Sequence, residues 1–442
     1  MMKIPETLRR VLVLGSGARE HAILWKLSQH LDLLLFAAPG NGGTATIADS
    51  FDLSIPKLSD CEEKWEQYFE NLICKCRLEK IDLVIPSTDS LLVRGVVDRL
   101  YQAGILAFGP TKMAAFLTEG SKAENYLLMK EFGIPCPKSQ ICNSRQEAKQ
   151  IAVTHKLPLV IKMDGIASGK GVVIAYTIKE AFEIIDDFMA SKEYGDAGKK
   201  LLIQDFLTGQ EVSLLAFSDG WNIVPMVPAH DYKKIYNGDR GQNTGGVGCY
   251  SPVPWLAKNT FEEMVKITET MIRGLAAKNH PFVGVIYPGF IITKSGHPKV
   301  LEFNCRPGDP ETQVILPQLE NDLLEVIFAC LEGKLNLIDV AWKKDFVYVG
   351  VVLCSKGYPT SKNLQMGEFI RILGEIEGNT LIFHAGTIKD SNGNLVTNGG
   401  RVLMAVGRGK SFKRAKWEAY LAAGQVWFSG IHYRTDIAED IV

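Results

Sequence analysis

The sequence predicts a multidomain α/β protein: an N-terminal parallel α/β domain, a central α/β domain with a mobile lid, and a C-terminal domain that is mostly β. Its 442 residues are too many for one core at about 100–200 residues per domain. Apolar runs alternate with helical patterns early in the chain, as in parallel sheets, and strand patterns dominate from about residue 336. We therefore expect domains at residues 1–116, 117–335 and 336–442.

The N-terminal domain is expected to be Rossmann-like, with strands followed by helices. Its first apolar run ends in Gly15-Ser16-Gly17, which predicts a buried strand entering a tight turn. We expect strands at residues 10–14, 33–38, 83–85 and 106–108, and helices at 20–30 and 93–103.

The central domain begins with a helical pattern that ends at Gly133 and Pro135. A smaller α/β unit, at about 137–206, is the expected lid. Residues 230–248 are rich in glycine and poor in apolar side chains, so we expect a long functional loop. The other expected elements are helices at 121–132, 179–190 and 321–332 and strands at 159–162, 171–175, 201–206, 286–293 and 299–304.

The C-terminal domain shows short apolar runs that end in one helical pattern. We expect strands at 347–353, 368–372, 381–384 and 401–406, and a helix at 412–425.

Composition argues against several classes of protein. The net charge of −1 gives no sign of nucleic-acid binding. No apolar run reaches the length of a membrane span, and the polar start of the chain does not resemble a signal peptide. The nine cysteines are scattered, with Cys74 and Cys76 as the one close pair, so we expect reduced thiols in a cytoplasmic protein.

The turn at residues 15–20 lies where a dinucleotide fingerprint would lie, between a strand and a helix. Glu20 replaces the third glycine, and Ala37-Ala38-Pro39 offers no acid for a ribose, so an NAD-dependent oxidoreductase is disfavoured. Backbone N–H groups at this turn, and in the loop at 39–43, suit an anion. Both segments are equally compatible with simple tight turns.

A glycine-rich segment at 162–171 joins two expected strands. Its spacing fails the Walker pattern, because three residues separate Gly165 from Gly169 and a strand follows. We interpret it as a flap that covers phosphates, rather than a hairpin loop with solvated lysines. Its candidate phosphate contacts are Lys162, Gly165, Ser168, Gly169, Lys170 and Gly171.

The segment at 301–312 carries the strongest signal. Alternation along a strand places Glu302, Asn304 and Arg306 on one face. A carboxylate and an amide oxygen suit Mg²⁺, and the arginine suits a transferring phosphoryl group. A surface strand with alternating polar residues is the alternative, which the dense polar run at 308–313 disfavours.

Two further segments are weaker on their own. The strand end at 204–211 could hold adenine through its backbone, or form an exposed acidic turn. Asp231 could bind an ammonium and Lys233 a phosphate, although solvated loop charges are the more common case.

Over essentially its whole length the chain resembles the phosphoribosylamine–glycine ligase family of ATP-grasp enzymes. The glycine turns alone are not specific, but the Asn-Thr-Gly-Gly and Glu-Phe-Asn-Cys-Arg segments are specific in this order. The resemblance rests on residues 14–21, 38–41, 108–112, 119–122, 164–172, 243–252, 302–313, 357–359, 384–387 and 397–402.

The resemblance implies ligation of glycine to 5-phosphoribosylamine with ATP and Mg²⁺ or Mn²⁺, in a monomer or weak homodimer that binds no nucleic acid or membrane. It implies an ATP-grasp domain with a mobile lid. Position by position it implies these roles: catalysis by Arg306, Lys162 and Asp309; ATP binding by Lys112, Lys162, the flap, Gln204, Asp205, Phe206, Leu207 and Glu211; metal binding by Glu302 and Asn304; and substrate binding by Gly15, Gly17, Arg19, Glu20, Gly40, Asn41, Asp89, Asp231 and Lys233.

The chain departs from the family at three places. Ser87-Thr88-Asp89 replaces Gly-Pro-Glu, Gln204-Asp205 replaces two glutamates, and Pro307 replaces an aromatic residue. The first departure leaves open a ligase with a different amine or acid. A nucleotide-binding module without turnover is the remaining alternative, which the retained Glu302 and Arg306 disfavour.

Overall fold

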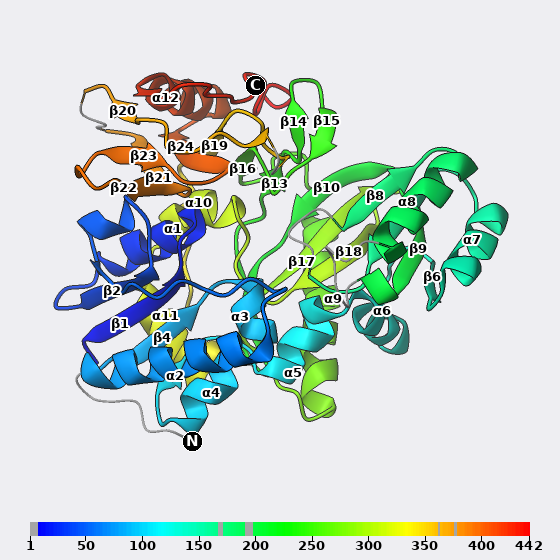
Figure 1. The fold of residues 1–442 in the computed structure, drawn as a ribbon, viewed down its shortest axis with the longest axis horizontal. Coiled ribbons are helices and arrows are strands. Elements are labelled where there is room, and N and C mark those ends of the chain that lie inside the picture. The colour runs from blue at the N-terminus through cyan, green and yellow to red at the C-terminus, as the bar shows by residue number, and fades with distance from the viewer. Residues whose placement is uncertain (1–7, 167–170, 191–197, 361–362, 375–377) are drawn as a thin grey trace.

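The computed structural model describes residues 8–166, 171–190, 198–360, 363–374 and 378–442. Figure 1 shows the N-terminal sheet at the lower left, the strand-rich C-terminal part above it, and the lid on the right. None of the helices in these ranges is long and apolar enough to cross a membrane. The expected class, α/β with several units, is confirmed.

The N-terminal sheet is parallel, in the order β3-β2-β1-β4-β5. The carboxyl ends of parallel strands meet at one edge of the sheet, so the turns that follow β1, β2 and β4 lie along that edge. These turns are at residues 15–20, 39–43 and 87–89. The strands are β1 (Arg10–Gly15), β2 (Leu34–Pro39), β3 (Asp49–Ser50), β4 (Leu83–Pro86) and β5 (Leu106–Ala107), and a 3-10 turn covers Thr44–Thr46.

The helix expected at 93–103 is shorter, at Val96–Gln102, and Gly95, whose φ of 84° is left-handed, separates it from a preceding helix at Asp89–Val93. A helix at Glu62–Leu78 was not expected, although Trp65, Phe69 and Leu72 bury one of its faces. The helices of this unit are α1 (Ala18–Leu27), α2 (Glu62–Leu78), α3 (Asp89–Val93), α4 (Val96–Gln102) and α5 (Lys112–Ala115).

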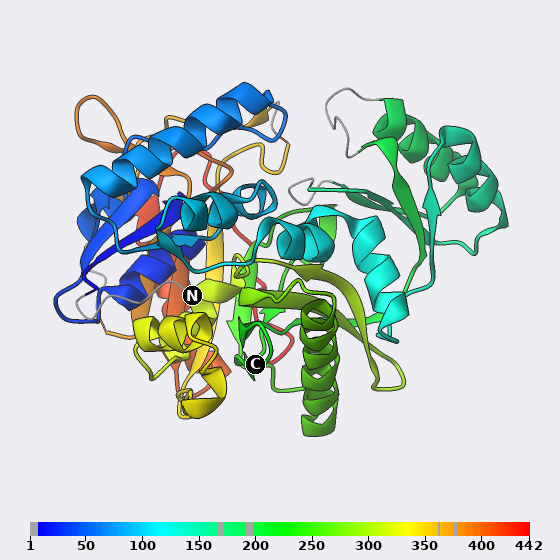
Figure 2. The same cartoon turned by 90° about the horizontal axis from the view of Figure 1, so that it is seen from below.

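The lid is a four-stranded antiparallel sheet, in the order β6-β9-β7-β8, covered by two helices. It has a hydrophobic core of its own, with Ile161, Ile185 and Ile203 fully buried. Figure 2 shows the lid on the right, on the opposite side of the molecule from the N-terminal unit. Its elements are β6 (Ser139–Cys142), α7 (Arg145–Thr154), β7 (Leu159–Met163), β8 (Val172–Ala175), α8 (Ile178–Ala190) and β9 (Leu201–Asp205), of which β6 and α7 were not expected.

The main sheet of the central unit has β17 at its centre. The first part of β17, residues 283–286, pairs with β11, and its later part pairs with both β10 and β18. The hairpin expected at 286–304 is confirmed as β17 and β18. The elements are a π-helical turn (Phe116–Gly120), α6 (Lys122–Glu131), β10 (Gly209–Ser213), β11 (Ala216–Asp219), β12 (Ile223–Pro225), α9 (Lys258–Ala277), β17 (Val283–Thr293), β18 (Pro298–Asn304), α10 (Glu311–Ile315), a 3-10 turn (Leu316–Gln318), α11 (Leu323–Leu331) and a 3-10 turn (Leu335–Leu337).

The third sheet draws strands from two parts of the chain, in the order β13-β16-β19-β24-β21. The prediction of a long loop at 230–248 is wrong. The segment contains a hairpin and contributes β13 to this sheet, and its residues Tyr232, Ile235 and Val247 are buried. The elements are β13 (His230–Asp231), β14 (Lys234–Tyr236), β15 (Arg240–Asn243), β16 (Gly248–Ser251), β19 (Val347–Cys354), β20 (Arg371–Ile372), β21 (Thr380–His384), β22 (Thr387–Lys389), β23 (Leu395–Thr397), β24 (Arg401–Gly409), α12 (Phe412–Gly424) and β25 (Val426–Trp427).

Candidate functional site

The lid meets the main sheet through a lysine at the end of β7. Lys162 Nζ donates to the Leu301 carbonyl on β18 at 3.0 Å, and its side chain is buried. Burial lowers the pKa of Lys162, and Glu302, the next residue on β18, opposes that shift. The contact therefore places Lys162 of the lid close to Glu302, the carboxylate that we expected to bind a metal ion.

Glu302 lies among cations. Burial by itself would raise the pKa of its carboxyl, but Lys162, Lys122 and Lys233 outweigh burial and hold the pKa below its usual value. The group is therefore an ionised carboxylate surrounded by ammonium groups. Such a cluster matches a polyanion together with a divalent cation.

The base of the flap is tied to the N-terminus of α6. Asp164 Oδ1 accepts hydrogen bonds from Ser121 Oγ at 2.9 Å and the Ala123 N–H at 3.0 Å. Lys122 Nζ donates to the Gly165 carbonyl at 2.6 Å, and the Met163 N–H donates to the Gly171 carbonyl at 2.8 Å. Three expected flap contacts, Ser168, Gly169 and Lys170, lie outside the described residues.

Asn304 uses one of its two side-chain polar atoms in a hydrogen bond. Its Nδ2 donates to the Tyr287 carbonyl at 3.1 Å, which leaves Oδ1 for another partner. The described residues contain no group of three or more His, Cys, Asp or Glu side chains able to hold a metal ion. A cation at Glu302 and Asn304 would need further oxygens from phosphate and water, as Mg²⁺ usually takes.

Arg306 is fixed by Glu119, which the sequence did not select. Its guanidinium is 2.9 Å from Glu119 Oε1, and the other carboxylate oxygen accepts the Cys305 N–H at 2.8 Å. Burial opposes charge on Arg306, yet Glu119 and Asp89 raise its pKa above the ordinary value. The arginine stays charged and is held in one orientation.

A second ion pair joins β10 to the 230–248 hairpin. Lys233 Nζ lies 2.6 Å from Glu211 Oε2, and Glu211 raises the pKa of Lys233 while Lys233 lowers that of Glu211. Asp231 has a buried Oδ1 without a hydrogen-bond partner among the described residues, and burial, reinforced by Glu311, raises the pKa of this carboxyl. An incoming ammonium would give that oxygen the donor it lacks.

Asp309 connects the loop after β18 to β24. Its carboxylate lies 3.0 Å from Arg401, and Arg401 also donates to the Asp309 carbonyl at 2.8 Å and the Gly245 carbonyl at 2.7 Å. Burial would raise the pKa of Asp309, but Arg401 and Arg19 outweigh it and lower the pKa. Gln313 donates to Asp309 at 2.7 Å, and its buried Oε1 has no partner in the part of the chain that the structure describes.

The two glycine turns of the N-terminal unit are cross-linked. The Gly17 N–H donates to Glu20 at 2.6 Å. We expected this N–H to be free to bind an anion, and the structure shows that it is not. Arg19 pairs with Glu20 at 2.7 Å and donates to the Pro307 carbonyl at 3.1 Å. Asn41 donates to the Ser16 carbonyl at 2.9 Å and so joins the two turns. Gly15 and Gly40 have φ values of 134° and 73°.

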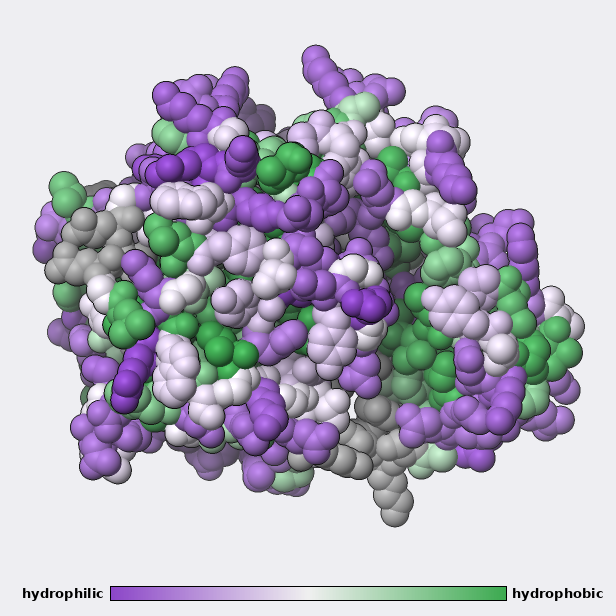
Figure 3. Space-filling view, turned by 90° about the horizontal axis from the view of Figure 1, so that it is seen from above, coloured by the Kyte–Doolittle hydropathy of each residue, from purple (hydrophilic) through white to green (hydrophobic). Residues whose placement is uncertain are grey.

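The residues expected at adenine lie at the junction of lid and main sheet. Gln204 is buried and donates to Ser139 at 2.8 Å. Asp205 lies 3.0 Å from His155, and Phe206 and Leu207 follow, partly exposed. Figure 3 shows the surface hollowed between the lid and the rest of the molecule.

Lys112 stands apart from the Glu302 cluster in the contacts it makes. It is exposed at the start of α5, its backbone N–H bonds Asp98 at 2.6 Å, and its side chain passes Gly95. Asp89, by contrast, contributes to the charge around Arg306 and Glu119.

Sequence reasoning missed four polar residues that complete the site. All four lie inside segments that carried the family resemblance, at 119–122, 302–313 and 397–402, where their presence was the available signal. The four residues are Glu119, Lys122, Glu311 and Arg401.

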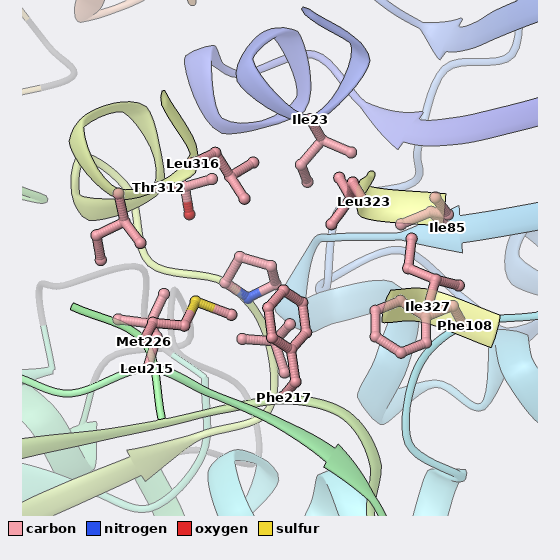
Figure 4. Close-up of a pocket in the computed structure, with 13 residues that line it drawn as sticks. Ile23, Ile85, Phe108, Leu215, Phe217, Met226, Thr312, Leu316, Leu323 and Ile327 are labelled. Atoms are coloured by element: carbon pink, nitrogen blue, oxygen red, sulfur yellow. The ribbon is translucent and has the colours of Figure 1, made fainter. Parts of the chain in front are cut away.

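A small apolar cavity lies behind the polar site. Its volume is about 30 Å³, and it lies between the N-terminal unit and the main sheet, next to Pro307 (Figure 4). Ile23, Phe217 and Leu316 are among its lining residues. An apolar space of this size is a packing void rather than a substrate site.

Comparison with known proteins gives a consistent result. Three family models describe the chain: "Phosphoribosylglycinamide synthetase, N domain" at residues 9–118, "Phosphoribosylglycinamide synthetase, ATP-grasp (A) domain" at 120–312 and "Phosphoribosylglycinamide synthetase, C domain" at 348–440. The phosphoribosylamine–glycine ligase of Neisseria meningitidis serogroup A is 39% identical over 98% of this chain and 99% of its own length. That of Vibrio vulnificus is 40% identical over 97% of each chain.

Solved structures agree on the architecture. The phosphoribosylamine–glycine ligase of Thermotoga maritima is 33% identical, with a TM-score of 0.80 over 97% of this chain and 100% of that one. A biotin carboxylase domain from Hydrogenobacter thermophilus, solved with MgADP and bicarbonate, is 15% identical with a TM-score of 0.76, over 99% of this chain and 98% of that one, and shares the fold.

Proposed function

The chain belongs to the phosphoribosylglycinamide synthetase family, and from this premise we propose how its residues carry out the reaction. It is an ATP-dependent ligase of purine biosynthesis that joins glycine to 5-phosphoribosylamine, giving glycinamide ribonucleotide, ADP and phosphate. Its substrates are small molecules. The observation that carries the assignment of the site is the convergence of Lys162 and Lys233 on the ionised Glu302.

ATP binds between the lid and the main sheet. Lys162, Lys112 and the flap neutralise its phosphates, because ammonium groups and backbone N–H groups match that charge. Gln204–Leu207 hold adenine, and Glu211 lies near the ribose. The end of β9 supports this placement, since the chain leaves the lid there and enters β10 of the main sheet at Gly209.

Glu302 and Asn304 hold the metal ion. The ionised carboxylate and the amide Oδ1 left after the Tyr287 contact are hard oxygen donors that fit Mg²⁺. When bound, the ion supplies charge stabilisation to the transferring phosphoryl group. We propose Mg²⁺, with Mn²⁺ as a substitute.

The first step moves the γ-phosphoryl group. A glycine carboxylate oxygen attacks the γ-phosphorus, the bond from that phosphorus to the bridging oxygen breaks, and ADP leaves with the electron pair. Arg306 and Lys162 stabilise the charge that develops. Glu119 supports this role, because it fixes the direction of the Arg306 guanidinium before the reaction begins.

The second step forms the amide. The amine of 5-phosphoribosylamine attacks the carbonyl carbon of glycyl phosphate, phosphate leaves, and the nitrogen loses a proton. The partnerless oxygen of Asp231 supports binding of the glycine ammonium at that residue, with Asp309 and Lys233 beside the reacting groups. Closure of the lid keeps water from the acyl phosphate.

The phosphoribosyl group lies against the N-terminal unit. The expected contacts follow strands β1, β2 and β4, whose ends share one edge of a parallel sheet. Because the Gly17 N–H is engaged by Glu20, other groups of these turns must supply the donors. The residues proposed here are Gly15, Gly17, Arg19, Glu20, Gly40, Asn41 and Asp89.

Release of ADP tests the proposal directly. Purified protein is mixed with ATP, Mg²⁺, glycine and freshly generated 5-phosphoribosylamine, and each is omitted in turn. Dependence of ADP release on all four supports the reaction. Release with another amine or acid but not with these would identify a different ligase, and binding of NAD(H) would favour an oxidoreductase.

The finer assignments are proposals of the same kind. We propose a monomer or weak homodimer in the cytoplasm, which sedimentation and cell fractionation test. The division at residues 1–116, 117–335 and 336–442, with the lid at about 137–206, also stays a prediction. Limited proteolysis tests it by locating the cut sites.

A further inference from the structure

Asp231 ends β13, and Lys233 lies in the short link between β13 and β14. Lys233 pairs with Glu211 on β10, whereas Tyr232 contacts Arg434 and Asp440 near the end of the chain, so these two neighbouring side chains point to different partners. The Lys233 carbonyl accepts hydrogen bonds from the N–H and hydroxyl of Thr244, both at 2.8 Å. The backbone that carries the two charged groups is therefore held on its hairpin side.

The opposite face packs on the end of the chain. Residues 432–440, which we call the C-terminal clamp, run along the hairpin at 230–243 (Figure 1). The Tyr232 hydroxyl donates to Asp440 and accepts the Ala438 N–H at 3.0 Å. His432 Nε2 lies 3.0 Å from the Ile235 carbonyl. The clamp thus touches the hairpin at several backbone and side-chain positions.

Arg434 is the centre of this clamp. Only 1% of the residue is exposed, and its guanidinium lies 4.9 Å from the centre of the Tyr232 ring. It binds both oxygens of Asp436 at 2.7 and 2.8 Å and Asp239 at 2.7 Å. It also donates to the Lys234 carbonyl at 3.1 Å. One buried cation therefore ties the clamp to the residue that follows Lys233.

We propose that Arg434 is a positioning residue for the ligation: it holds Tyr232 and the Lys234 carbonyl so that Asp231 and Lys233 face the substrates. The inference rests on the proposed function of those two residues. Arg434 acts through them and makes no contact with the other site residues in the described part of the chain. A shift of about 1 Å at a reacting group can cost 100-fold in rate, so small movements of the hairpin matter.

The decisive variant is Arg434→Lys, which keeps the charge but loses the planar fork. Arg408→Lys is the matched control, because Arg408 lies on β24, in the sheet that also contains β13, with its guanidinium 4.7 Å from the Phe346 ring, and it donates to Asn379 instead of the hairpin. We expect Arg434→Lys to lower kcat/KM for glycine at least tenfold, with KM for ATP within threefold of wild type. Arg408→Lys should stay within twofold on both.

Tyr232→Phe provides a second route, since it removes only the hydroxyl that reaches Asp440. Like Arg434→Lys, this variant should have a lower kcat/KM for glycine than the wild type. If Arg434→Lys does not fold, as judged by circular dichroism, an unchanged kcat/KM in Tyr232→Phe overturns the proposal. Equal effects of Arg434→Lys and Arg408→Lys, or a loss that matches the unfolded fraction, would overturn it as well.

Hydrogen exchange separates this inference from the proposed function. Peptides covering 230–243 should exchange faster in Arg434→Lys than in Arg408→Lys, whether or not the protein turns over. A wild-type protein that releases no ADP with glycine and 5-phosphoribosylamine would refute the proposed function. Unchanged exchange in that hairpin would refute the positioning role on its own.

Discussion

Replacement of Arg306 by lysine separates a role in phosphoryl transfer from a role in binding ATP. The guanidinium is 2.9 Å from Glu119 and 3.3 Å from the Pro307 carbonyl, and 19% of its side chain is exposed. Lysine keeps the positive charge and the pairing with Glu119, but it has no second fixed N–H to aim at a phosphoryl oxygen. The substitution therefore changes direction more than charge.

The expected size follows from one lost charge-assisted hydrogen bond. Such a bond, directed at charge that develops in the transition state, contributes about 2–3 kcal/mol. At about 1.4 kcal/mol per factor of ten, kcat should fall about 30-fold to 140-fold. KM for ATP should change less than threefold, because the other cations still bind the phosphates in the ground state.

Steady-state ADP release at saturating glycine and 5-phosphoribosylamine gives both constants. Arg99→Lys serves as the control, since Arg99 also pairs with a glutamate, Glu66, but lies on α4 of the N-terminal unit. A rise in KM for ATP with unchanged kcat would refute the reasoning and leave Arg306 with a role in binding alone.

Three other perturbations have defined outcomes. Glu302→Gln should lower metal-dependent turnover about 100-fold or more, because the metal's contribution is several kcal/mol; undiminished turnover in an Mg²⁺ titration would remove the metal assignment. Arg401→Lys should lower the free energy of unfolding in urea by about 3 kcal/mol, since two bonds among those to Gly245 and Asp309 are lost; a change below about 1 kcal/mol would contradict this. Burial lowers the pKa of His21 to about 3 and of His384 to about 4, below the unfolded value of 6.5, so the unfolded chain binds more protons. Stability should therefore fall by about 1.4 kcal/mol per histidine for each pH unit from 6.5 toward 4, and a flat urea midpoint over that range would refute it.

Local patterns predicted the elements that build the site. The polar alternation at 302–306 and the glycines at 165–171 are properties of adjacent residues, so they survive without tertiary information. The same is true of the turns that end β1 and β2. The helix α2 could also have been predicted, because Trp65, Phe69 and Leu72 repeat with helical spacing.

The hairpin at 230–248 was beyond that reasoning. Its few apolar residues cannot form a core, and they become buried only because β13 pairs with β16 and the chain end packs on Tyr232. Gly95 similarly divided a continuous apolar pattern, since its left-handed φ is imposed by the turn between α3 and α4.

The sequence by itself determined which chemical groups this protein has and on which strand ends and turns they lie. Only the tertiary structure decided their pairing. Glu119 meets Arg306 across 187 residues of chain and Arg401 meets Asp309 across 92. Such contacts depend on how separate sheets pack, and burial then sets which groups stay charged, so neither the partners nor their pKa values follow from local pattern.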